Sequence, residues 1–568
     1  MAMFFSKSRI ALVFFFAAAL CLSGLLVSSV LAGTDLPPEK IQEIGQKMYR
    51  DGVLPSGDPI KAFVSDDVPV DGTAFTCVSC HLHSGMGSIE GEVITPPTNG
   101  RILYEPREPF IKGYEHVPSF SNYAKYLPVR PAYTDQTLAE LIQGGVDPTG
   151  RSVLHVMPRY DIYGEDMDIL IAYLKTLSDQ PSPGVSKEQI KFATVIVEGT
   201  DPKAVKSMLD PIQFGIDRKN ALAVAAGNND RVARMGYNML GPDLMAKKFT
   251  LSHWILKGAP ETWRAQLEDY YQNEPVFALL GGISEGDWAP VHQFCEDMHL
   301  PNLFPVVDYP VLSDTDWYTL YLSRGVRQEG EAAARYLMSI QSLLKDGAIL
   351  QVYRDNPRGQ ALADGFREIW NTAGNTAAIE ATLTPGEKLT KTQLQQLINK
   401  HKPVAVIVWD DESALPALTE VAAGESHPNF FVASATWLDQ SIYSVPEPLR
   451  GFLYMTYPYR LPQEEARFKT LLNKVLQGKS IALYDEKIFK KGYITNQMIG
   501  DALMEMRSEY YRDFLLDSIG MMEDTYLPLY ERLTFGPGQR YASKGCFIVQ
   551  LSDGDKPKLE RRSEWIIK

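Results

Sequence analysis

The pentapeptide Cys77-Val78-Ser79-Cys80-His81 constrains this chain more than any other stretch of its sequence. Two thiols separated by two residues can reach the two vinyl groups on one edge of a porphyrin, and His81 is then placed beneath the iron as an axial ligand. A thiol-redox Cys-x-x-C does not need that histidine. A zinc site needs a further ligand pair, and the sequence has no second Cys-x-x-C. The motif therefore predicts one covalently attached haem c.

The second axial ligand must come from farther along the chain. Met157 lies in a short segment just before a predicted helix, and a thioether stabilises ferrous iron and raises the reduction potential. Three alternatives are weaker. Met86 follows His81 too closely to reach the opposite haem face, Met167 falls inside the predicted helix, and His155 would give a bis-histidine haem. We therefore predict His81 and Met157 as the two ligands of the haem iron.

The first 32 residues predict an export signal. Lys7 and Arg9 precede an uncharged, mostly apolar run over residues 10–32, and this run ends in Val30-Leu31-Ala32 before Gly33, as a signal peptidase prefers. The run is also long enough to span a bilayer if it is never cleaved. We predict a cleaved signal peptide and a periplasmic protein, with an uncleaved membrane anchor as the alternative. Export agrees with the haem motif, because haem is attached outside the cytoplasm.

The rest of the chain divides into parts with different patterns. A length of 568 residues is too great for one hydrophobic core. Residues 33–178 are rich in turns and end in an amphipathic helix, whereas residues 179–188 hold two prolines and a glycine and predict a linker. From residue 189 to 568, short apolar runs alternate with amphipathic helices. This alternation predicts parallel sheets with helices on both faces, divided between two lobes.

Residues 38–178 resemble a class I cytochrome c, which implies an all-α domain whose first and last helices cross. The resemblance implies helices over Glu39–Tyr49 and Glu165–Leu177, crossing at Gly45, Tyr49 and Tyr173. The departure from the family is a long stretch over residues 51–75, between the first helix and the haem motif.

The same resemblance implies a partner for the axial histidine. In the family, a proline carbonyl after the motif accepts the Nδ1 proton of the histidine and so orients the ring. Pro96 or Pro97 has the matching position in this chain.

Residues 189–552 resemble a type I periplasmic solute-binding protein, of the kind that binds branched-chain amino acids and amides for ABC transporters. The resemblance rests on Leu280–Gly286 followed by Pro301–Pro305, on Tyr353–Gln360, and on Phe535–Gln539. It implies a two-lobed α/β fold with a small-molecule ligand in the cleft between the lobes, at the carboxyl ends of the strands.

The resemblance also implies a pocket, which we assign to Ser284, Asp308, Tyr309 and Arg358. Ser284 heads a predicted helix over 285–298, where it can bind a ligand carboxylate or cap the helix. Asp308 belongs to a stretch that differs from the family's usual Ala-Thr, and an aspartate there would repel a carboxylate and pair with an amine or with hydroxyls. Arg358 stands where the family usually has a tyrosine. These substitutions argue against an ordinary amino acid as the ligand.

Two further pairs of residues keep two interpretations each. Trp409 and Trp437 can stack on a ligand or fill the core, which is the commoner place for tryptophan. Cys295 and Cys546 can form a disulfide in an exported protein or remain buried free thiols.

Net charge and missing motifs exclude several functions. A net charge of −14 argues against nucleic acid or anionic lipid as a partner. The sequence has no Gly-x-Ser-x-Gly and no P-loop, so nothing indicates a hydrolase or a nucleotide enzyme. A haem with both axial positions filled usually carries electrons instead of transforming substrates, and an oxidoreductase role with a partner stays open as a third interpretation.

The leading prediction is a periplasmic electron-transfer cytochrome, not an enzyme, whose redox partner is a dehydrogenase or another cytochrome. In this prediction the fused binding domain couples the recognition of a small molecule, or the docking of a partner, to electron transfer by the haem. The alternative is the solute receptor of an ABC-type amino acid or amide transporter, with an auxiliary haem domain.

Overall fold

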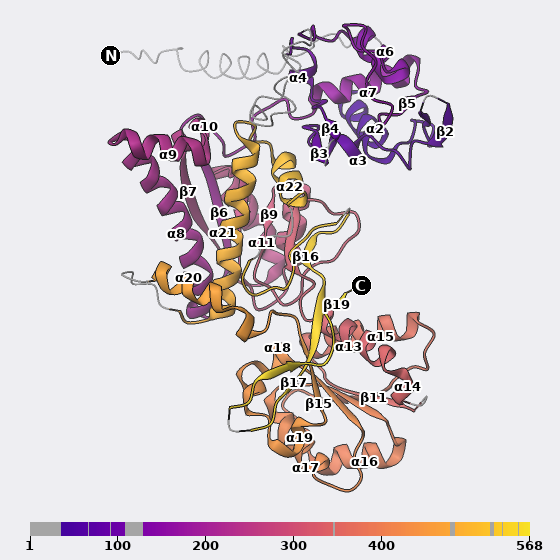
Figure 1. Ribbon diagram of the computed structural model, residues 1–568, viewed down its shortest axis with the longest axis vertical. Coiled ribbons are helices and arrows are strands. Elements are labelled where there is room, and N and C mark those ends of the chain that lie inside the picture. The colour runs from indigo at the N-terminus through magenta and orange to yellow at the C-terminus, as the bar shows by residue number, and fades with distance from the viewer. Residues whose placement is uncertain are drawn as a thin grey trace, which may run out of the picture. The chain divides into compact units, whose positions relative to one another are not determined.

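The computed structural model describes residues 36–65, 67–90, 93–107, 129–344, 347–476, 483–522, 527–536, 538–554 and 556–567. The chain divides into two compact units, one ending at Gln180 and the other beginning at Pro181 (Figure 1). The predicted signal peptide, residues 1–32, lies outside the described residues. Within the described ranges, no helix is both long enough and apolar enough to cross a bilayer.

The first unit is organised around two helices that cross. Its helices are α2 (Pro38–Asp51), α3 (Val78–His81), α4 (Gly100–Leu103), α6 (Asp135–Gly144) and α7 (Gly164–Thr176). Helices α2 and α7 meet where Gly45 faces Tyr173, so closely that a Cβ on Gly45 would lie 2.4 Å from Tyr173 Cβ. The rings of Tyr49 and Tyr173 pack beside this point, with centroids 5.6 Å apart. The helices therefore cross at the residues expected from the sequence.

The prediction of an all-α first unit is wrong, because this unit also contains strands. They are β1 (Lys61–Val64), β2 (Val68–Asp71), β3 (Ser88–Glu90), β4 (Val93–Thr95) and β5 (Arg159–Tyr160). Strand β1 pairs antiparallel with β2 and with β5, and β3 pairs with β4. Strands β1 and β2 arise from the long stretch after the first helix. Its backbone N–H and C=O groups need partners, which strand pairing supplies.

Each lobe of the second unit is built on a parallel sheet. The first sheet has the order β16-β10-β9-β8-β6-β7, and all its neighbouring strands are parallel. Its strands are β6 (Gln189–Val197), β7 (Lys248–Leu256), β8 (Ala278–Leu280), β9 (Asn302–Leu303), β10 (Thr319–Ser323) and β16 (Tyr541–Ser543). Along β6, Ile190 and Phe192 enter one hydrophobic cluster, and Ala193 and Val195 enter another. Both faces of the sheet are therefore buried, as parallel sheets require.

Helices cover the two faces of this first sheet. They are α8 (Pro202–Gly227), α9 (Asp230–Leu240), α10 (Pro242–Ala246), α11 (Trp263–Asn273), α12 (Ala289–Asp297), α21 (Glu486–Met506) and α22 (Arg512–Gly520), with a 3₁₀ turn η1 (Pro260–Thr262). Arg512 of α22 fastens its helix to the strand ends by donating to the carbonyl oxygens of Val276, Phe277 and His299 at 2.6, 3.1 and 3.1 Å. Helix α20 (Ala466–Leu476) packs Phe468 against Phe489 of α21.

The second sheet has the order β12-β11-β13-β14-β15-β17-β18, with β19 beside β17. Its strands are β11 (Ile349–Arg354), β12 (Ile379–Leu383), β13 (Ala405–Trp409), β14 (Phe430–Ser434), β15 (Leu453–Tyr457), β17 (Gly545–Leu551), β18 (Leu559–Arg561) and β19 (Ile566–Ile567). The first five strands of this order are parallel, and β17 runs antiparallel to β15.

The helices of this lobe also lie on both faces of its sheet. They are α13 (Arg327–Ser339), α14 (Gln341–Leu344), α15 (Pro357–Thr372), α16 (Lys391–His401), α17 (Leu415–Ala422), α18 (Ala435–Leu438) and α19 (Glu447–Arg450), with 3₁₀ turns η2 (Glu412–Ala414), η3 (Asp439–Ser444) and η4 (Pro462–Glu464). Leu337 of α13 and Phe366 of α15 share a cluster with Ile407, whereas Leu394 of α16 and Leu418 of α17 share the other cluster with the sheet.

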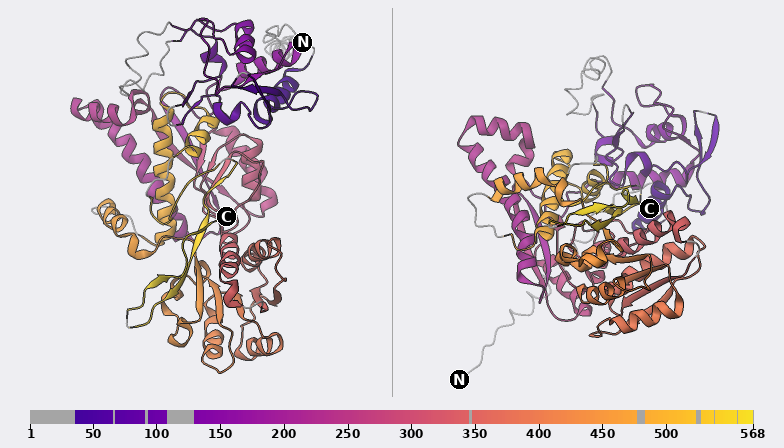
Figure 2. Two further views of the ribbon diagram at one scale, coloured as in Figure 1. Left: turned by 45° about the vertical axis from the view of Figure 1, so that its right-hand side comes forward. Right: turned by 60° about the horizontal axis from the view of Figure 1, so that its bottom comes forward.

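The chain passes three times between the lobes of the second unit (Figures 1 and 2). It crosses from β10 to α13, from β15 toward α21, and from β16 to β17, where Lys544 alone separates the two strands. The predicted two-lobed α/β fold is confirmed for this unit. Because the connections from β10 to α13 and from β16 to β17 are only a few residues long, the lobes can pivot about them without unfolding.

The structure settles the interpretation of Cys295, Cys546 and Trp409. Cys295 and Cys546 are fully buried free thiols, so the disulfide alternative is wrong. Trp409 is fully buried and donates its indole N–H to Gln351 Oε1 at 3.0 Å, so it belongs to the core. Trp437 is also buried but borders the cleft described below.

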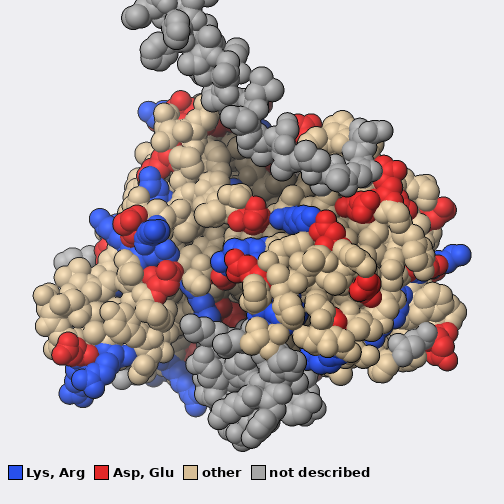
Figure 3. All heavy atoms as spheres, turned by 90° about the horizontal axis from the view of Figure 1, so that it is seen from above, with Lys and Arg blue, Asp and Glu red and all other residues tan. Residues whose placement is uncertain are grey.

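The charge on the surface is mixed in sign. Figure 3 shows acidic and basic side chains interspersed among uncharged residues on the face turned to the viewer. The net charge of −14 is therefore not gathered into one acidic patch on this face.

The contact at Gly45 leads to a first prediction. Gly45→Ala places a methyl group against Tyr173 Cβ and is expected to destabilise the first unit by about 2 kcal/mol. Hydrogen exchange of the α2 peptide, measured in the full-length protein, reports this loss as faster exchange.

Gly144→Ala is the matched control, because a Cβ at Gly144 in α6 meets no atom within 4 Å. Removing a helical glycine there is expected to stabilise α6 by about 0.5–1 kcal/mol. Equal effects of the two substitutions would contradict the close crossing of α2 and α7.

Candidate functional site

A cavity of about 520 Å³ lies between the two lobes of the second unit. The first lobe contributes loop residues that follow β8 and β9, and the second contributes the start of α15 and a residue of α18. The lining residues are Glu285, Gly286, Asp287, Tyr309, Asn356, Pro357, Arg358 and Trp437. Because both lobes line it, a molecule in this cavity would contact both at once.

The four predicted pocket residues have different places in the cleft. Tyr309 and Arg358 line the cavity directly. Asp308 forms an ion pair with Arg358, so the structure joins these two residues across the cleft. Ser284 is buried behind the lining, where its Oγ accepts the N–H of Gly286 at 3.1 Å.

The expected helix cap at Ser284 is wrong. Helix α12 begins at Ala289, later than predicted, and the N–H of Ala289 is held by Asp287 Oδ1 at 2.9 Å. Ser284 instead stabilises the turn that carries Glu285 and Gly286 into the cavity wall. The helix starts late because the sequence Ser-Glu-Gly-Asp favours turns stabilised by side chains over an immediate helix.

The Asp308–Arg358 pair is half-exposed, with 36% of the Asp308 side chain and 32% of the Arg358 side chain accessible. Burial works to lower the pKa of Arg358, but the charges and hydrogen bonds of Asp308 and Tyr309 together outweigh burial, so the pKa is raised. The guanidinium carbon also lies 5.8 Å from the ring centroid of Trp437. Burial, followed by the charge of Asp308, raises the pKa of Tyr309. These contacts hold Arg358 as a charged group in the cavity wall.

A buried ion pair fixes the loop that presents Arg358. Arg354, the last residue of β11, donates to both carboxylate oxygens of Asp410 at 2.6 and 2.7 Å. The side chain of Asp410 is completely buried. Helix α15 then begins at Pro357, and Asn356 Oδ1 caps it by accepting the N–H of Gly359 at 2.8 Å. Arg358 therefore projects from a rigid strand-to-helix turn.

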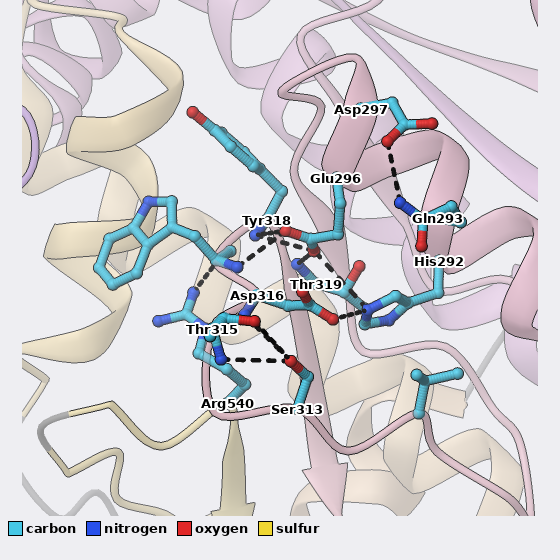
Figure 4. Close-up of polar contacts among 12 residues, drawn as sticks. His292, Gln293, Glu296, Asp297, Ser313, Thr315, Asp316, Tyr318, Thr319 and Arg540 are labelled. Atoms are coloured by element: carbon cyan, nitrogen blue, oxygen red, sulfur yellow. Dashed lines mark hydrogen bonds and ion pairs between the residues drawn. The ribbon is translucent and has the colours of Figure 1, made fainter. Parts of the chain in front are cut away.

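A polar network anchors the end of the loop between β9 and β10, which carries the aspartate of the interlobe ion pair (Figure 4). The Glu296 carboxylate accepts the backbone N–H groups of residues 317–319 at 2.8–3.0 Å. His292, four residues earlier on α12, contacts Asp316 Oδ2 through Nε2 at 2.8 Å and the Tyr321 hydroxyl through Nδ1 at 2.9 Å. The loop is thus fastened at β10, which limits where its first residues can move.

A second cation lies near the interlobe pair. Lys491 of α21 is partly buried among Tyr459, Tyr530 and Asp308. Burial works to lower its pKa, but these groups outweigh burial and raise it. Sequence reasoning missed Lys491, because nothing in the pattern of a long amphipathic helix marks which lysine lies near a charged pair from other elements.

The first unit places the haem-motif residues on one short helix. Cys77 precedes α3, and Cys80 and His81 lie within it. Both thiols are free. His81 is buried, and its Nδ1 lies 2.9 Å from the carbonyl oxygen of Pro96. Of the two prolines considered, Pro96 makes this contact. With the proton on Nδ1, the other ring nitrogen, Nε2, is the one that can bind a metal.

Burial favours the neutral forms of His81 and Cys77. Burial lowers the pKa of His81 to about 4, although the Pro96 carbonyl opposes this shift. Burial raises the pKa of the Cys77 thiol to about 12. A neutral imidazole is the form that binds iron.

The segment around Met157 lies beside the haem motif. Tyr160 donates its hydroxyl to the carbonyl of Phe75 at 2.7 Å, and its strand β5 pairs with β1. Met157 is half-buried, whereas its neighbours Leu154 and Val156 are 67% and 57% exposed. Met167 packs in the core of the unit instead. The structure thus brings the Met157 segment near the motif, and the described residues leave Leu154 and Val156 of this segment exposed.

Comparison with known proteins identifies the larger unit. The profile of a family described as periplasmic binding protein matches residues 256–554, more than half of the chain. No curated protein matches the chain.

Solved structures resemble the chain at low identity, and the first of these has a TM-score that supports a shared fold. A protein from Rhodospirillum rubrum named for branched-chain amino acid ABC transport has 15% identity and a TM-score of 0.50, over 66% of this chain and 100% of its own. An ABC transporter substrate-binding protein from Sphaerobacter thermophilus has 16% identity and a TM-score of 0.49, over 67% and 98%. A leucine-binding protein from Thermotoga maritima has 14% identity and a TM-score of 0.43, over 66% and 98%.

The buried pair behind the cleft leads to a second prediction. Asp410→Asn leaves the Arg354 charge buried without its counter-ion and is expected to cost about 3 kcal/mol of unfolding free energy. Urea unfolding of the full-length protein measures this loss.

Asp364→Asn is the control. It removes the carboxylate of an exposed pair with Arg367 in the same lobe, and it is expected to cost less than about 1 kcal/mol. Similar costs for Asp364→Asn and Asp410→Asn would contradict a structural role for the buried pair.

Proposed function

The chain belongs to the periplasmic binding protein family, and we propose that its second unit is the receptor of an ABC-type transporter for a small organic solute. The observation that carries this proposal is the cavity of about 520 Å³ whose lining is divided between the two lobes. This volume lies in the range of small-molecule sites. The Rhodospirillum rubrum protein with the shared fold is named for the same kind of transport.

The chain's own residues explain how such a receptor would work. Tyr309 on the first lobe and Asn356, Arg358 and Trp437 on the second offer hydrogen-bonding and aromatic groups to one ligand. A ligand that contacts both lobes binds the closed arrangement more tightly than an open one, so it shifts the population toward closure. The transporter can then distinguish the loaded receptor by its shape.

The receptor proposal predicts that Tyr309 contributes to solute affinity. Thermal-shift screening with amino acids, amides and short acids should find a solute that raises the Tm of the protein. Tyr309→Ala should then weaken binding of that solute at least tenfold by calorimetry, because it removes a side chain that lines the cavity.

Tyr237→Ala is the matched control. Tyr237 is 49% exposed on α9 and does not line the cavity, so its loss should leave affinity unchanged. Failure of every solute in the screen to raise the Tm would refute the receptor proposal.

For the first unit we propose a second function, which is electron transfer by one covalently attached haem c. Its support is the contact between His81 Nδ1 and the Pro96 carbonyl, together with two free thiols beside it. Cys77 and Cys80 would hold the haem, and His81 and Met157 would bind its iron. The exposed Leu154 and Val156 fit the same interpretation, since a porphyrin would give them apolar cover. When bound, the haem supplies a one-electron redox couple.

The cellular setting of this proposal follows from both units. We propose export to the periplasm, which is the usual location of the receptor family and the place where c-type haem is attached. The redox partner would be a dehydrogenase or another cytochrome. If the two functions are coupled, solute affinity must depend on the redox state of the haem, and the reduction potential must shift by the reciprocal amount.

The haem proposal is tested by expressing the full-length protein with haem-maturation machinery. Mass spectrometry should find one haem on the peptide containing Val78 and Ser79, and a Cys77→Ser, Cys80→Ser double variant should lose it. Met157→Ala should abolish the ferric absorption band typical of methionine ligation, whereas Met86→Ala should keep it.

Cys295→Ser is the control, since this thiol is buried in the other unit and should not affect the haem. A colourless wild-type protein, with no adduct on that peptide, would contradict the proposal.

A further inference from the structure

The cationic side chain that lines the cavity is already neutralised by the protein itself. Arg358 from the second lobe pairs with Asp308 from the first, and Tyr309 lies beside them. We propose that Asp308 fills the anion-binding position of the cleft, so that the receptor accepts ligands with amide, hydroxyl or amino groups and rejects carboxylates. This inference rests on the proposed receptor function and names the class of its ligand.

Asp308 occupies the place that a ligand carboxylate would take. A guanidinium binds carboxylates strongly, and in this structure Nη2 of Arg358 donates to Oδ2 of a carboxylate from the opposite lobe. Both side chains remain about one-third exposed, so the pair lies at the cavity wall and not within the core. A second carboxylate that approached Arg358 would lie close to Asp308 and be repelled.

The remaining lining is acidic as well. Glu285 and Asp287 belong to the first-lobe wall, where Glu285 Oε1 accepts the N–H of Asp201 at 3.3 Å and Asp287 Oδ1 accepts the N–H of Ala289 at 2.9 Å. Both side chains are exposed, so a ligand in the cavity can reach them. Together with Asp308, the carboxylates at this wall outnumber the single guanidinium of the lining, which favours neutral or cationic ligands that donate hydrogen bonds.

The surroundings of Asp308 indicate what its removal would do. Arg358 contacts it directly, and after Tyr530 and Tyr459 its charge is one of those that raise the pKa of Lys491 on α21. Without the Asp308 carboxylate, Arg358 would lose its counter-ion and Lys491 would lose part of the negative charge near it. A ligand carboxylate would then bind where the wild-type protein rejects it.

The test compares wild type with Asp308→Asn, which keeps the size and removes the charge. Formate, as the smallest carboxylate, should raise the Tm of the Asp308→Asn variant in a saturable manner and leave wild type unchanged. In calorimetry with matched pairs, benzoate against benzamide and leucine against leucinamide, the variant should shift its preference toward the acid by at least tenfold. Adding Arg358→Met to the variant should abolish both effects.

Asp314→Asn is the matched control, because Asp314 is an exposed carboxylate on the same loop and outside the cavity lining. This control should behave like wild type. The inference is overturned if Asp308→Asn gains neither formate stabilisation nor a shift toward acids. It is also overturned if wild type already binds the acids as tightly as the amides. Either result leaves the receptor function standing as long as wild type binds any solute of the screen.

Discussion

The burial of both faces of two parallel sheets is the constraint on which the second unit depends. Strands such as β6 and β13 turn apolar side chains to both sides, so helices must cover both faces of each sheet. The loops at the carboxyl ends of the strands are then the natural places for polar chemistry. Asp308 follows β9 and Arg358 follows β11, and in the structure these two loops face each other across the cleft.

The Asp308–Arg358 pair affects recognition more than stability. A half-exposed ion pair contributes little to the free energy of folding, since water solvates both charges well in its absence. Its effect on a ligand is larger, because a charge that is already paired cannot be offered to a second anion. The buried Arg354–Asp410 pair affects stability more than recognition, because it holds the loop that presents Arg358. The second unit thus uses aspartate–arginine pairs for two purposes, one at the cleft between the lobes and one buried within a lobe.

The first unit combines local and distant constraints. Cys77, Cys80 and His81 lie close together because they are near in the sequence: Cys80 and His81 belong to the short helix α3, and Cys77 directly precedes it. The contact of His81 with the Pro96 carbonyl depends on a loop that returns over residues 82–95, including the β3–β4 hairpin. The segment that holds Met157 comes close only because β5 pairs with β1. The strands that made the all-α prediction wrong are therefore the same elements that bring the Met157 segment to the motif.

The sequence by itself determined the features that depend on short-range pattern. These are the spacing of Cys77, Cys80 and His81, the crossing of the first unit at Gly45 and Tyr173, the alternation that required parallel sheets in two lobes, and two residues of the cavity lining, Tyr309 and Arg358. Only the tertiary structure decided which groups meet: that Asp308 pairs with Arg358, that Ser284 supports a turn and caps no helix, and that Lys491 lies near Asp308. The physical reason is that periodicity reports which side of an element is apolar, whereas the partner of a charged side chain depends on the placement of loops that are distant in the chain.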